Sequence, residues 1–386
     1  DAFEEAYPGT TVEIECNKTI ETTLANDIQA GNYPDVVHLA TSRGPAITES
    51  MINNKQLRDL TPVLSMTNPG EETTVGDKIK DGFTETNATN PYDDGKTYLM
   101  PMFYGPCGLF YSASLFEEKG WTVPTTWEEM WELGDKAKEE GISLFTYPTT
   151  GYFDAFTYAL LATTSKGMDL FESVVTYEEG IWDTEEARQV LDIVGKLAEY
   201  TEPTTTENAN DIDFSKNQQL VIDGKALFCP NGTWLPGEMA DSTPEGFVWG
   251  MTAVPAIDAS QKPSSYTFLE QIWSPTEAKN PAGADAFIAF MYSDKAVEIF
   301  ANAGAAQPVE GIDELLDPAV ADFYRIYDDG TVTAVMGSFR ATQDIGVTMT
   351  DSFFTPVNAL VAGDITVDEW QAGIKEASEA LRAATV

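Results

Sequence analysis

Histidine and cysteine, on which most metal and disulfide chemistry depends, are scarce in this 386-residue chain. His38 is the single histidine, so a metal site with several histidine ligands is excluded, and a Ser-His-Asp triad would have to use that residue. The three cysteines, Cys16, Cys107 and Cys229, match no zinc or CxxC spacing and are odd in number. We therefore expect free, buried thiols, and neither a metal nor a cofactor.

Basic residues are also few. The chain has 22 Lys+Arg against 63 Asp+Glu, which gives a formal net charge of −41. A field of that sign repels phosphate backbones and anionic membranes, so nucleic acid is excluded as a partner and an anionic ligand is disfavoured. A neutral ligand fits this composition best, and the charge itself is first of all a source of solubility.

Long apolar runs, low-complexity tracts and internal repeats are absent from the sequence. No stretch approaches the ~20 apolar residues that cross a bilayer, and the length suggests two domains of roughly 100–200 residues each. The chain opens at Asp1 without a signal peptide, and residues 1–9 have the pattern of a helix end and a turn. We expect a further N-terminal segment that was processed or left out.

Short strands alternate with helices in the sequence. Residues 11–16 alternate apolar and polar side chains, and residues 34–39 are a short apolar run, with a helix between them that ends near Gly31. This order predicts a parallel sheet and an α/β fold. Residues 109–111 and 226–228 are predicted as further buried strands.

Four helices are predicted from their N-terminal signals. Three have a capping-box spacing and one has an N-cap asparagine followed by proline. The signals are Thr125 with Glu128, Asp183 with Glu186, Thr366 with Glu369, and Asn280 with Pro281.

A series of short motifs, in order along nearly the whole chain, resembles the extracellular carbohydrate-binding proteins of ABC importers, the family 1 group that includes maltose-binding protein. Each motif is weak alone, and their order makes the resemblance specific. The motifs are Phe3-Glu-Glu-Ala-Tyr-Pro-Gly9, Ala30-Gly-Asn-Tyr-Pro-Asp-Val-Val37, Leu57-Arg-Asp-Leu-Thr-Pro62, Gly95-Lys-Thr-Tyr98, Phe116-Glu-Glu-Lys-Gly120, Pro124-Thr-Thr-Trp-Glu-Glu129, Asn231-Gly-Thr-Trp234 and Lys279-Asn-Pro-Ala-Gly-Ala284.

The resemblance implies the type II fold of periplasmic binding proteins, with two interleaved α/β lobes and a ligand cleft between them. We expect lobe 1 to comprise residues 1–104 and 255–306, and lobe 2 residues 105–254 and 307–386. The family binds its ligand by hinge closure. It also implies an extracellular location, as a lipoprotein or a periplasmic protein. Its members carry a strand and most of a helix before the segment that corresponds to Phe3.

A sugar site combines aromatic platforms with planar hydrogen-bonding groups, because sugars present flat apolar faces and hydroxyls. Trp234 follows the strand 226–228, where the family places a stacking tryptophan, and the alternative is an ordinary core tryptophan. Asn231 in the same loop either bonds a hydroxyl or shapes the turn.

Two further loops are expected from the resemblance to meet ligand. Ser42 and Arg43 follow the strand 34–39, and Arg43 could bind two hydroxyls, although a solvated surface arginine is as good an alternative. Tyr152 and Asp154 lie where the family places a stacking tyrosine, and Tyr152 could instead pack against a helix start.

The remaining candidates lie near the expected crossovers and in the C-terminal part. Tyr104 faces either the cleft or the hinge, and Glu270 and Gln271 are candidates for a polar clamp. Arg340 and Phe353 lie where the family closes over its ligand.

The predicted function is capture of a neutral mono- or oligosaccharide, and its delivery to the permease subunits of an ABC importer by a monomeric receptor without catalytic activity. A glycoside hydrolase would need two carboxylates roughly 5–10 Å apart, and the many acidic residues leave this alternative open although no motif fixes a pair. A surface glycan-binding module, which would bind polymer without lobe closure, is the other alternative.

Overall fold

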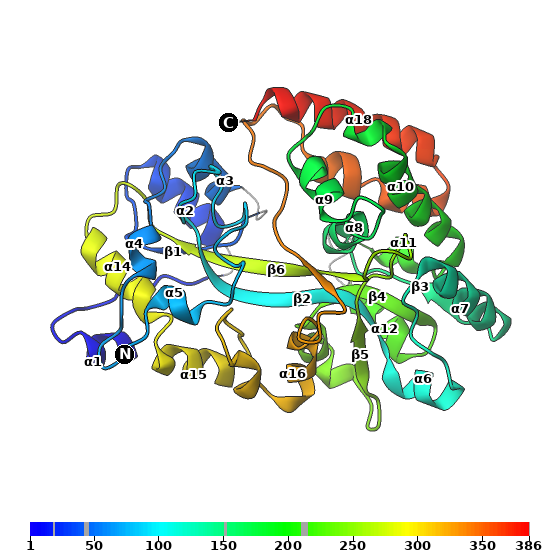
Figure 1. The fold of residues 1–386 in the computed structure, drawn as a ribbon, viewed down its shortest axis with the longest axis horizontal. Coiled ribbons are helices and arrows are strands. Elements are labelled where there is room, and N and C mark those ends of the chain that lie inside the picture. Colours follow the sequence, from blue (N-terminus) through cyan, green and yellow to red (C-terminus); the bar gives the residue numbers. More distant parts are fainter. Residues whose placement is uncertain (18–19, 42–45, 150–152, 210–214, 386) are drawn as a thin grey trace.

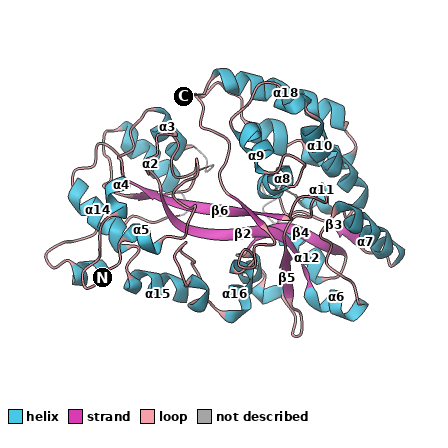
Figure 2. Cartoon of the chain, in the orientation of Figure 1, coloured by secondary structure: helices cyan, strands magenta, loops and turns pink. Residues whose placement is uncertain are grey.

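The computed structural model describes residues 1–17, 20–41, 46–149, 153–209 and 215–385. The strands in these ranges are β1 (Val37–His38), β2 (Met100–Ser112), β3 (Ser143–Phe145), β4 (Ala226–Gly232), β5 (Trp249–Thr252), β6 (Ser264–Trp273) and β7 (Thr333–Val335). They form one mixed sheet in the order β1-β6-β2-β4-β3, in which β5 also pairs with β2 and β7 with β6. The long strands β2 and β6 run side by side across the middle of the molecule (Figures 1 and 2).

Helices gather at both ends of this sheet and leave the two long strands to join the halves (Figure 1). None of the helices in the described ranges has the length and apolar character that a membrane crossing requires. The α-helices are α1 (Ala2–Ala6), α2 (Ile20–Gln29), α3 (Ile47–Asn53), α4 (Thr61–Leu64), α5 (Val75–Lys78), α6 (Ala113–Lys119), α7 (Trp127–Glu139), α8 (Phe153–Leu161), α9 (Met168–Val175), α10 (Glu185–Leu197), α11 (Thr205–Asn208), α12 (Ser215–Ile222), α13 (Leu235–Glu238), α14 (Pro281–Phe290), α15 (Asp294–Asn302), α16 (Pro318–Tyr324), α17 (Val357–Ala362) and α18 (Val367–Ala383).

Most strand pairs in this sheet are antiparallel, so the predicted parallel sheet is wrong. β2 pairs antiparallel with β4, β5 and β6, and β1 pairs antiparallel with β6. Parallel pairing joins β3 to β4 and β6 to β7. The two long strands run antiparallel because the chain crosses from one lobe to the other along β2 and returns along β6.

The segment 11–16 forms no strand, contrary to the prediction from its alternating pattern. It pairs with none of the described strands. Val12 packs against the lobe 1 core, whereas Ile14 is 79% exposed, so the alternating residues do not form a buried face. Cys16 in the same segment is exposed, which corrects the prediction of a buried thiol. Cys107 and Cys229 are buried and free, as predicted.

The predicted helix starts lie within one residue of the observed ones, because helix capping is a local interaction. The capping box Thr366–Glu369 begins α18, and Asn280 caps α14. The box of α7 is Thr126–Glu129, one residue later than predicted, and Thr184 rather than Asp183 caps α10.

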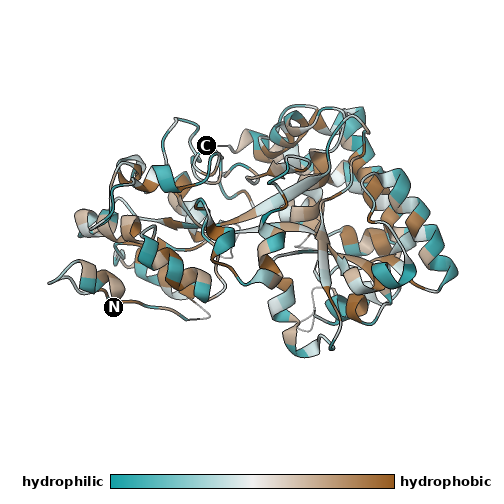
Figure 3. Cartoon of the chain, turned by 60° about the horizontal axis from the view of Figure 1, so that its bottom comes forward, coloured by the Kyte–Doolittle hydropathy of each residue, from teal (hydrophilic) through white to brown (hydrophobic). Residues whose placement is uncertain are grey.

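Two large hydrophobic cores lie on either side of the midline. The lobe 2 core is packed by α7 to α10, α17 and α18, and the lobe 1 core by α4, α5, α14 and α15. Many helices carry hydrophobic residues along one side and hydrophilic residues along the other (Figure 3). β6 contributes to both cores, with Tyr266 in that of lobe 2 and Leu269 in that of lobe 1. Ile312 and Tyr324 pack into the lobe 1 core, although residues from 307 onward were predicted in lobe 2.

Candidate ligand-binding site

Strands β2 and β6 turn alternate side chains to opposite faces of the sheet. On one face, here named the site face, Gly105 and Cys107 of β2 lie opposite Phe268 and Tyr266 of β6. Phe268 is half-buried, whereas Tyr266 is 9% exposed. An aromatic side chain thus remains partly open at the point where the two lobes join.

The Trp234 indole lies against glycines of two neighbouring strands. A Cβ atom on Gly232 of β4 would come within 2.2 Å of the indole, and one on Gly105 within 3.3 Å. The indole also meets the Phe268 ring edge to face, with centroids 5.6 Å apart. Because strand glycines allow such close approach, they form a seat that holds the half-buried indole as a platform next to the site face.

Asp154 lies in the first turn of α8, a helix that packs against β2, β4 and β6. Its carboxylate accepts a hydrogen bond from the N–H of Ala155. Part of the residue remains open to solvent, yet burial of the carboxyl raises its pKa to about 7. Burial, and then the charge of Asp154, raise the pKa of the Cys107 thiol and of the Tyr266 phenol. Asp154 lies in the first turn of the helix whose Tyr158 packs against Tyr266 of the site face.

A row of aromatic rings continues from the site face toward the C-terminal part of the chain. The Tyr266 ring lies 5.3 Å from that of Tyr158 in α8, and Tyr158 lies 5.7 Å from Phe339. Phe339 stacks on Tyr177 with centroids 5.5 Å apart. It belongs to residues 336–343, here named the strap, which lie within the orange trace of Figure 1.

The strap is hydrogen-bonded to both lobes. Asn87 of lobe 1 donates from Nδ2 to the carbonyl of Ser338 (2.7 Å) and accepts from its N–H (3.2 Å). In lobe 2, the Val175 carbonyl accepts the N–H of Arg340 at 2.8 Å, and the Tyr177 hydroxyl donates to the Arg340 carbonyl at 3.1 Å. A pocket opens between the strap and lobe 1. Its lining comprises Thr41, Glu49, Ile52, Asn87, Ala88, Pro91, Ser338, Phe339, Arg340 and Ala341.

Three of the predicted site residues belong to one continuous region. Trp234 contacts Phe268 on the site face, Asp154 lies beside the same face, and Arg340 lines the strap pocket next to Phe339. The Arg340 guanidinium is 34% exposed on its side chain and lies 3.9 Å from the Asp93 carboxylate, so it carries a charge at the junction of the lobes.

Glu270 and Gln271 point to opposite faces of β6 and form different interactions. Glu270 pairs with His38 across a 3.0 Å contact between Oε2 and Nε2, and both side chains remain partly exposed. Gln271 is 1% exposed, and its amide donates to the Ala88 carbonyl and accepts from the N–H of Thr41. The Gln271 amide therefore holds two loops of lobe 1 together and has no surface left for a polar clamp on ligand.

Asn231, Tyr104 and Phe353 are turned into the protein. Asn231 is 4% exposed and its Oδ1 accepts the N–H of Gly232, which matches the turn-shaping alternative. Tyr104 is 5% exposed and packs against Tyr324 in the lobe 1 core, which matches the hinge alternative. Phe353 is 0% exposed in the lobe 2 core and offers no surface to a ligand.

Ser42, Arg43 and Tyr152 lie outside the described residues. Their predicted contacts with ligand stay predictions.

Phe268 and Phe339 were missed by the sequence reasoning. Phe268 lies in a strand that mixes polar and apolar residues and is buried on both faces for most of its length, so its half-open position has no periodic signal. The sequence did contain one signal for this region. Gly232 stands in a strand two residues before Trp234, and a strand glycine often marks a place where another group approaches the backbone closely.

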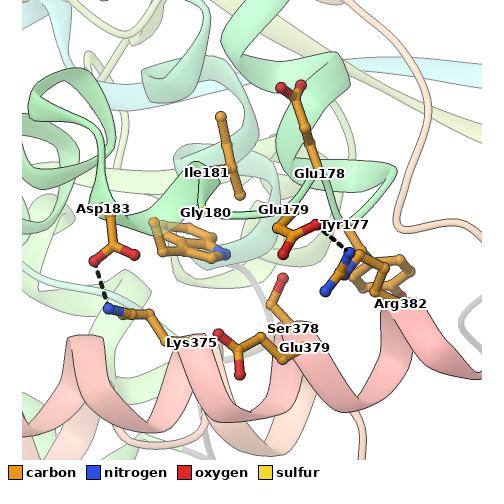
Figure 4. A pocket seen from close by; sticks show the side chains of 11 residues that line it. Tyr177, Glu178, Glu179, Gly180, Ile181, Asp183, Lys375, Ser378, Glu379 and Arg382 are labelled. Atoms are coloured by element: carbon orange, nitrogen blue, oxygen red, sulfur yellow. Dashed lines mark hydrogen bonds and ion pairs between the residues drawn. The ribbon is translucent and has the colours of Figure 1, made fainter.

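A second pocket lies in lobe 2, between residues 177–183 and α18 (Figure 4). Its charged groups are largely paired with one another, Lys375 with Asp183 and Arg382 with Glu179. This pocket lies apart from the site face, and its ion pairs serve to hold α18 against the lobe.

The comparison with known proteins agrees with this architecture. A model of the bacterial extracellular solute-binding proteins matches residues 1–312. The diacetylchitobiose binding protein NgcE of Streptomyces coelicolor is 29% identical over 220 residues, which are 55% of this chain and 45% of that protein. The match thus spans less than half the length of this curated relative.

Solved structures share the fold at low sequence identity. The apo form of RafE from Streptococcus pneumoniae gives a TM-score of 0.74 at 17% identity and covers 99% of this chain and 93% of its own. RafE in complex with raffinose gives 0.69, with 99% of this chain and 94% of its own covered at 17% identity. A family 1 extracellular solute-binding protein from Bifidobacterium longum subsp. infantis gives 0.71 at 16% identity, with coverage of 98% and 94%.

These matches confirm the predicted two-lobed type II fold and the predicted relationship. The chain belongs to the family of bacterial extracellular solute-binding proteins.

Proposed function

We propose that this protein is the sugar-binding component of an ABC importer, which captures a mono- or oligosaccharide between its lobes and delivers it to the membrane permease. The observation that carries the proposal is the Trp234 platform on its glycine seat, beside the half-buried Phe268. Flat apolar rings next to a polar group are what a sugar ring requires of a site, since one face of the sugar stacks and its edge forms hydrogen bonds.

The names of the relatives support a carbohydrate ligand. NgcE is named for diacetylchitobiose, and one structure of RafE holds raffinose. Each name concerns its own protein, and what the two ligands share is the chemistry of a sugar.

The proposed site combines residues from both lobes. Trp234, Phe268 and Asp154 form its floor and lobe 2 side, and Arg340 and Phe339 of the strap form its rim. Ser42, Arg43 and Tyr152 remain proposed ligand contacts on the strength of the resemblance. Glu270 is proposed as a contact at the lobe 1 end of the floor, because its side chain is partly exposed there.

We propose that the chain crosses between the lobes along β2, along β6 and after Tyr324. Ile312 and Tyr324 pack with lobe 1, and Tyr266 packs with lobe 2, which supports this division in place of boundaries at residues 255 and 307. Closure would rotate the lobes about these crossings and bring the strap pocket toward the site face.

The proposed protein acts outside the cytoplasm as a monomer, held by a lipid anchor or free in a periplasm, and returns its ligand chemically unchanged. Binding to the folded state alone stabilises a protein by RT ln(1 + [L]/Kd), about 2.7 kcal/mol at a hundredfold excess over Kd.

A thermal-shift screen against mono- and oligosaccharides, with amino acids and peptides as controls, tests the proposal. A shift with one sugar class, followed by chromatographic recovery of the intact sugar, supports a transport receptor. A shift with a peptide alone would overturn the carbohydrate proposal. Cleavage of the sugar would favour a glycoside hydrolase instead.

A further inference from the structure

A hydrogen bond between the two lobes lies directly beside the Trp234 platform. Thr233, the residue before Trp234, and Tyr324, the last residue of α16, have their hydroxyl oxygens 3.1 Å apart, and either hydroxyl can donate. Thr233 is 7% exposed and Tyr324 is 8% exposed. Because water has little access to this position, each of the two hydroxyls relies on the other as its partner.

The two partners belong to different lobes. Tyr324 is part of the lobe 1 core, whereas Trp234, next to Thr233, packs against the lobe 2 core. The helix α16 lies beside β2, near the middle of the molecule (Figure 1). After Tyr324 the chain leaves lobe 1 along the last of the proposed crossings, so a rotation of the lobes acts directly on this bond.

The Thr233 hydroxyl and the Trp234 indole share one space above Gly105 of β2. A Cβ atom on this glycine would come within 2.8 Å of Thr233 Oγ1 and within 3.3 Å of the indole. The hydroxyl that Tyr324 holds and the ring proposed to stack on sugar are therefore neighbours over the same backbone. Because they are also adjacent in the chain and closely packed, a shift of the hydroxyl is expected to move the ring.

Tyr104 provides an internal comparison. Its ring packs edge to face on that of Tyr324, with centroids 5.2 Å apart, and it is buried in the same lobe 1 core. Its hydroxyl, however, is buried without a hydrogen-bond partner in the described part of the chain. The two tyrosines are therefore alike in burial and packing, and Tyr324 alone of the pair is bonded to the residue beside the platform.

We propose that Tyr324 is a positioning residue for the sugar site, which holds the Trp234 platform from lobe 1 through the Thr233 hydroxyl. The platform then takes its position from both lobes, because lobe 2 carries the indole and lobe 1 fixes the residue before it. Sugar affinity thus depends on the arrangement of the lobes even without a contact between lobe 1 and the sugar. The inference rests on the proposed function, since it concerns the regulation of the same site.

The test is a double-mutant cycle between Tyr324→Phe and Trp234→Ala, measured by isothermal titration calorimetry. The probe is whichever of raffinose, diacetylchitobiose, maltotriose and cellotriose the wild type binds most tightly. Tyr324→Phe alone should weaken binding about fivefold, the equivalent of one neutral hydrogen bond. In the Trp234→Ala background the same substitution should change the affinity by less than about twofold, because the ring through which it acts is gone.

Two further variants separate positioning from a general loss of stability. Thr233→Val removes the bond from its other end and should weaken binding by the same factor, which keeps the proposal testable if Tyr324→Phe does not fold. Tyr104→Phe is the matched control, because it removes a buried hydroxyl that is bonded to none of the described groups. Its affinity should equal that of the wild type.

Wild-type affinity in Tyr324→Phe would overturn the inference and leave the proposed function standing. An equal loss from Tyr324→Phe with and without the Trp234 indole would overturn it as well, because the residue would then act on the fold and not on the platform. The same holds for an equal loss in Tyr104→Phe. Failure of every sugar in the panel to bind the wild type would instead overturn the proposed function, and the inference with it.

Discussion

The two faces of strand β6 divide its ten residues between them and differ in chemistry. On the site face, Phe268 is half-buried and meets the half-buried Trp234 indole edge to face. On the other face, here named the hinge face, the Tyr327 hydroxyl lies 2.6 Å from Thr267 Oγ1 and 3.1 Å from Ser265 Oγ.

The contrast separates groups that stabilise the fold from groups that can contact a ligand. Polar groups inside proteins are usually paired, and the Ser265 and Thr267 hydroxyls of the hinge face follow this rule. The site face instead presents the half-buried rings of Phe268 and Trp234 at the point where the lobes join. Hydroxyls that are paired within the protein stabilise the fold, whereas a partly open aromatic surface is available to a ligand.

Titration of Asp154 should produce the largest difference between the two faces. Its pKa is about 7 in the fold, against roughly 3.9 in an unfolded chain. Since the folded value is the higher one, its contribution to stability is fully present below about pH 4 and is lost as the pH rises through 7. Relative to Asp154→Asn, the unfolding free energy of the wild type should fall over this window by up to roughly 4 kcal/mol, and by less where solvent reaches the carboxyl.

Urea unfolding of both proteins at half-unit pH steps measures this difference. The titratable neighbours Cys107, Tyr158 and Tyr266 remain neutral throughout, because burial raises the pKa of each one. Asp169→Asn serves as the control, because Asp169 is an exposed acid in the first turn of the neighbouring helix α9. Curves for wild type and Asp154→Asn that run parallel from pH 4 to 7.5 would show that the carboxyl is not buried as described.

Loss of the aromatic platform should affect binding more than stability. Trp234→Ala removes the stacking surface and should weaken sugar binding by about 2 kcal/mol, roughly thirtyfold in Kd, as measured by calorimetry. The matched control is Trp131→Ala, since Trp131 packs on Trp127 in lobe 2 with ring centroids 5.1 Å apart. A similar loss of affinity in both variants would remove the special role of Trp234.

Loss of a hydroxyl on the hinge face should do the reverse. Tyr327→Phe leaves Thr267 and Ser265 without their shared partner, which should lower the unfolding free energy by about 1–2 kcal/mol. Sugar affinity should stay within about twofold of the wild type, because this face does not meet the ligand. Denaturant unfolding and calorimetry on the same sample give both values. A large loss of affinity without a loss of stability would reverse the assignment of the faces.

Release of the strap from lobe 1 should have the smallest effect. Asn87→Ala removes the two hydrogen bonds to Ser338, and water can replace them at this partly open position, so we expect a loss of about 0.5–1 kcal/mol. Hydrogen exchange at the Ser338 amide should become faster. Asn208→Ala, which removes two hydrogen bonds within lobe 2, to Thr204 and Asn217, should leave that amide unchanged. Unchanged exchange in Asn87→Ala would show that lobe 2 alone holds the strap.

Helix starts and the family were predictable from the sequence, whereas strand pairing was not. A capping box such as Thr366–Glu369 is decided within four residues, so its physics is visible locally. The longest pairing of β2 is with β6, more than 150 residues further along the chain, and nothing in either strand indicates that they run antiparallel. Segment 11–16 shows the converse, because a correct strand pattern without a partner forms no strand.

The resemblance pointed to Trp234 and Asp154, and the structure places both residues near the site face, while their contact with ligand stays a prediction. Gln271 and Phe353 have the right chemistry for a sugar site, but both stabilise the fold. The Gln271 amide hydrogen-bonds two loops, and Phe353 packs in the lobe 2 core. Which polar groups a protein leaves unpaired depends on contacts between distant segments, and these appear only in the folded chain.

The shared strand pair has a consequence for how the chain acquires its structure. The lobe 1 half of β2 is synthesised long before β6, so one edge of it stays unpaired while most of lobe 2 emerges. Completion of the central sheet therefore depends on a contact of high sequence separation, which is slow to form. A protein whose central strand stays incomplete until late remains unfolded for longer, and that is the state in which a chain can be threaded across a membrane.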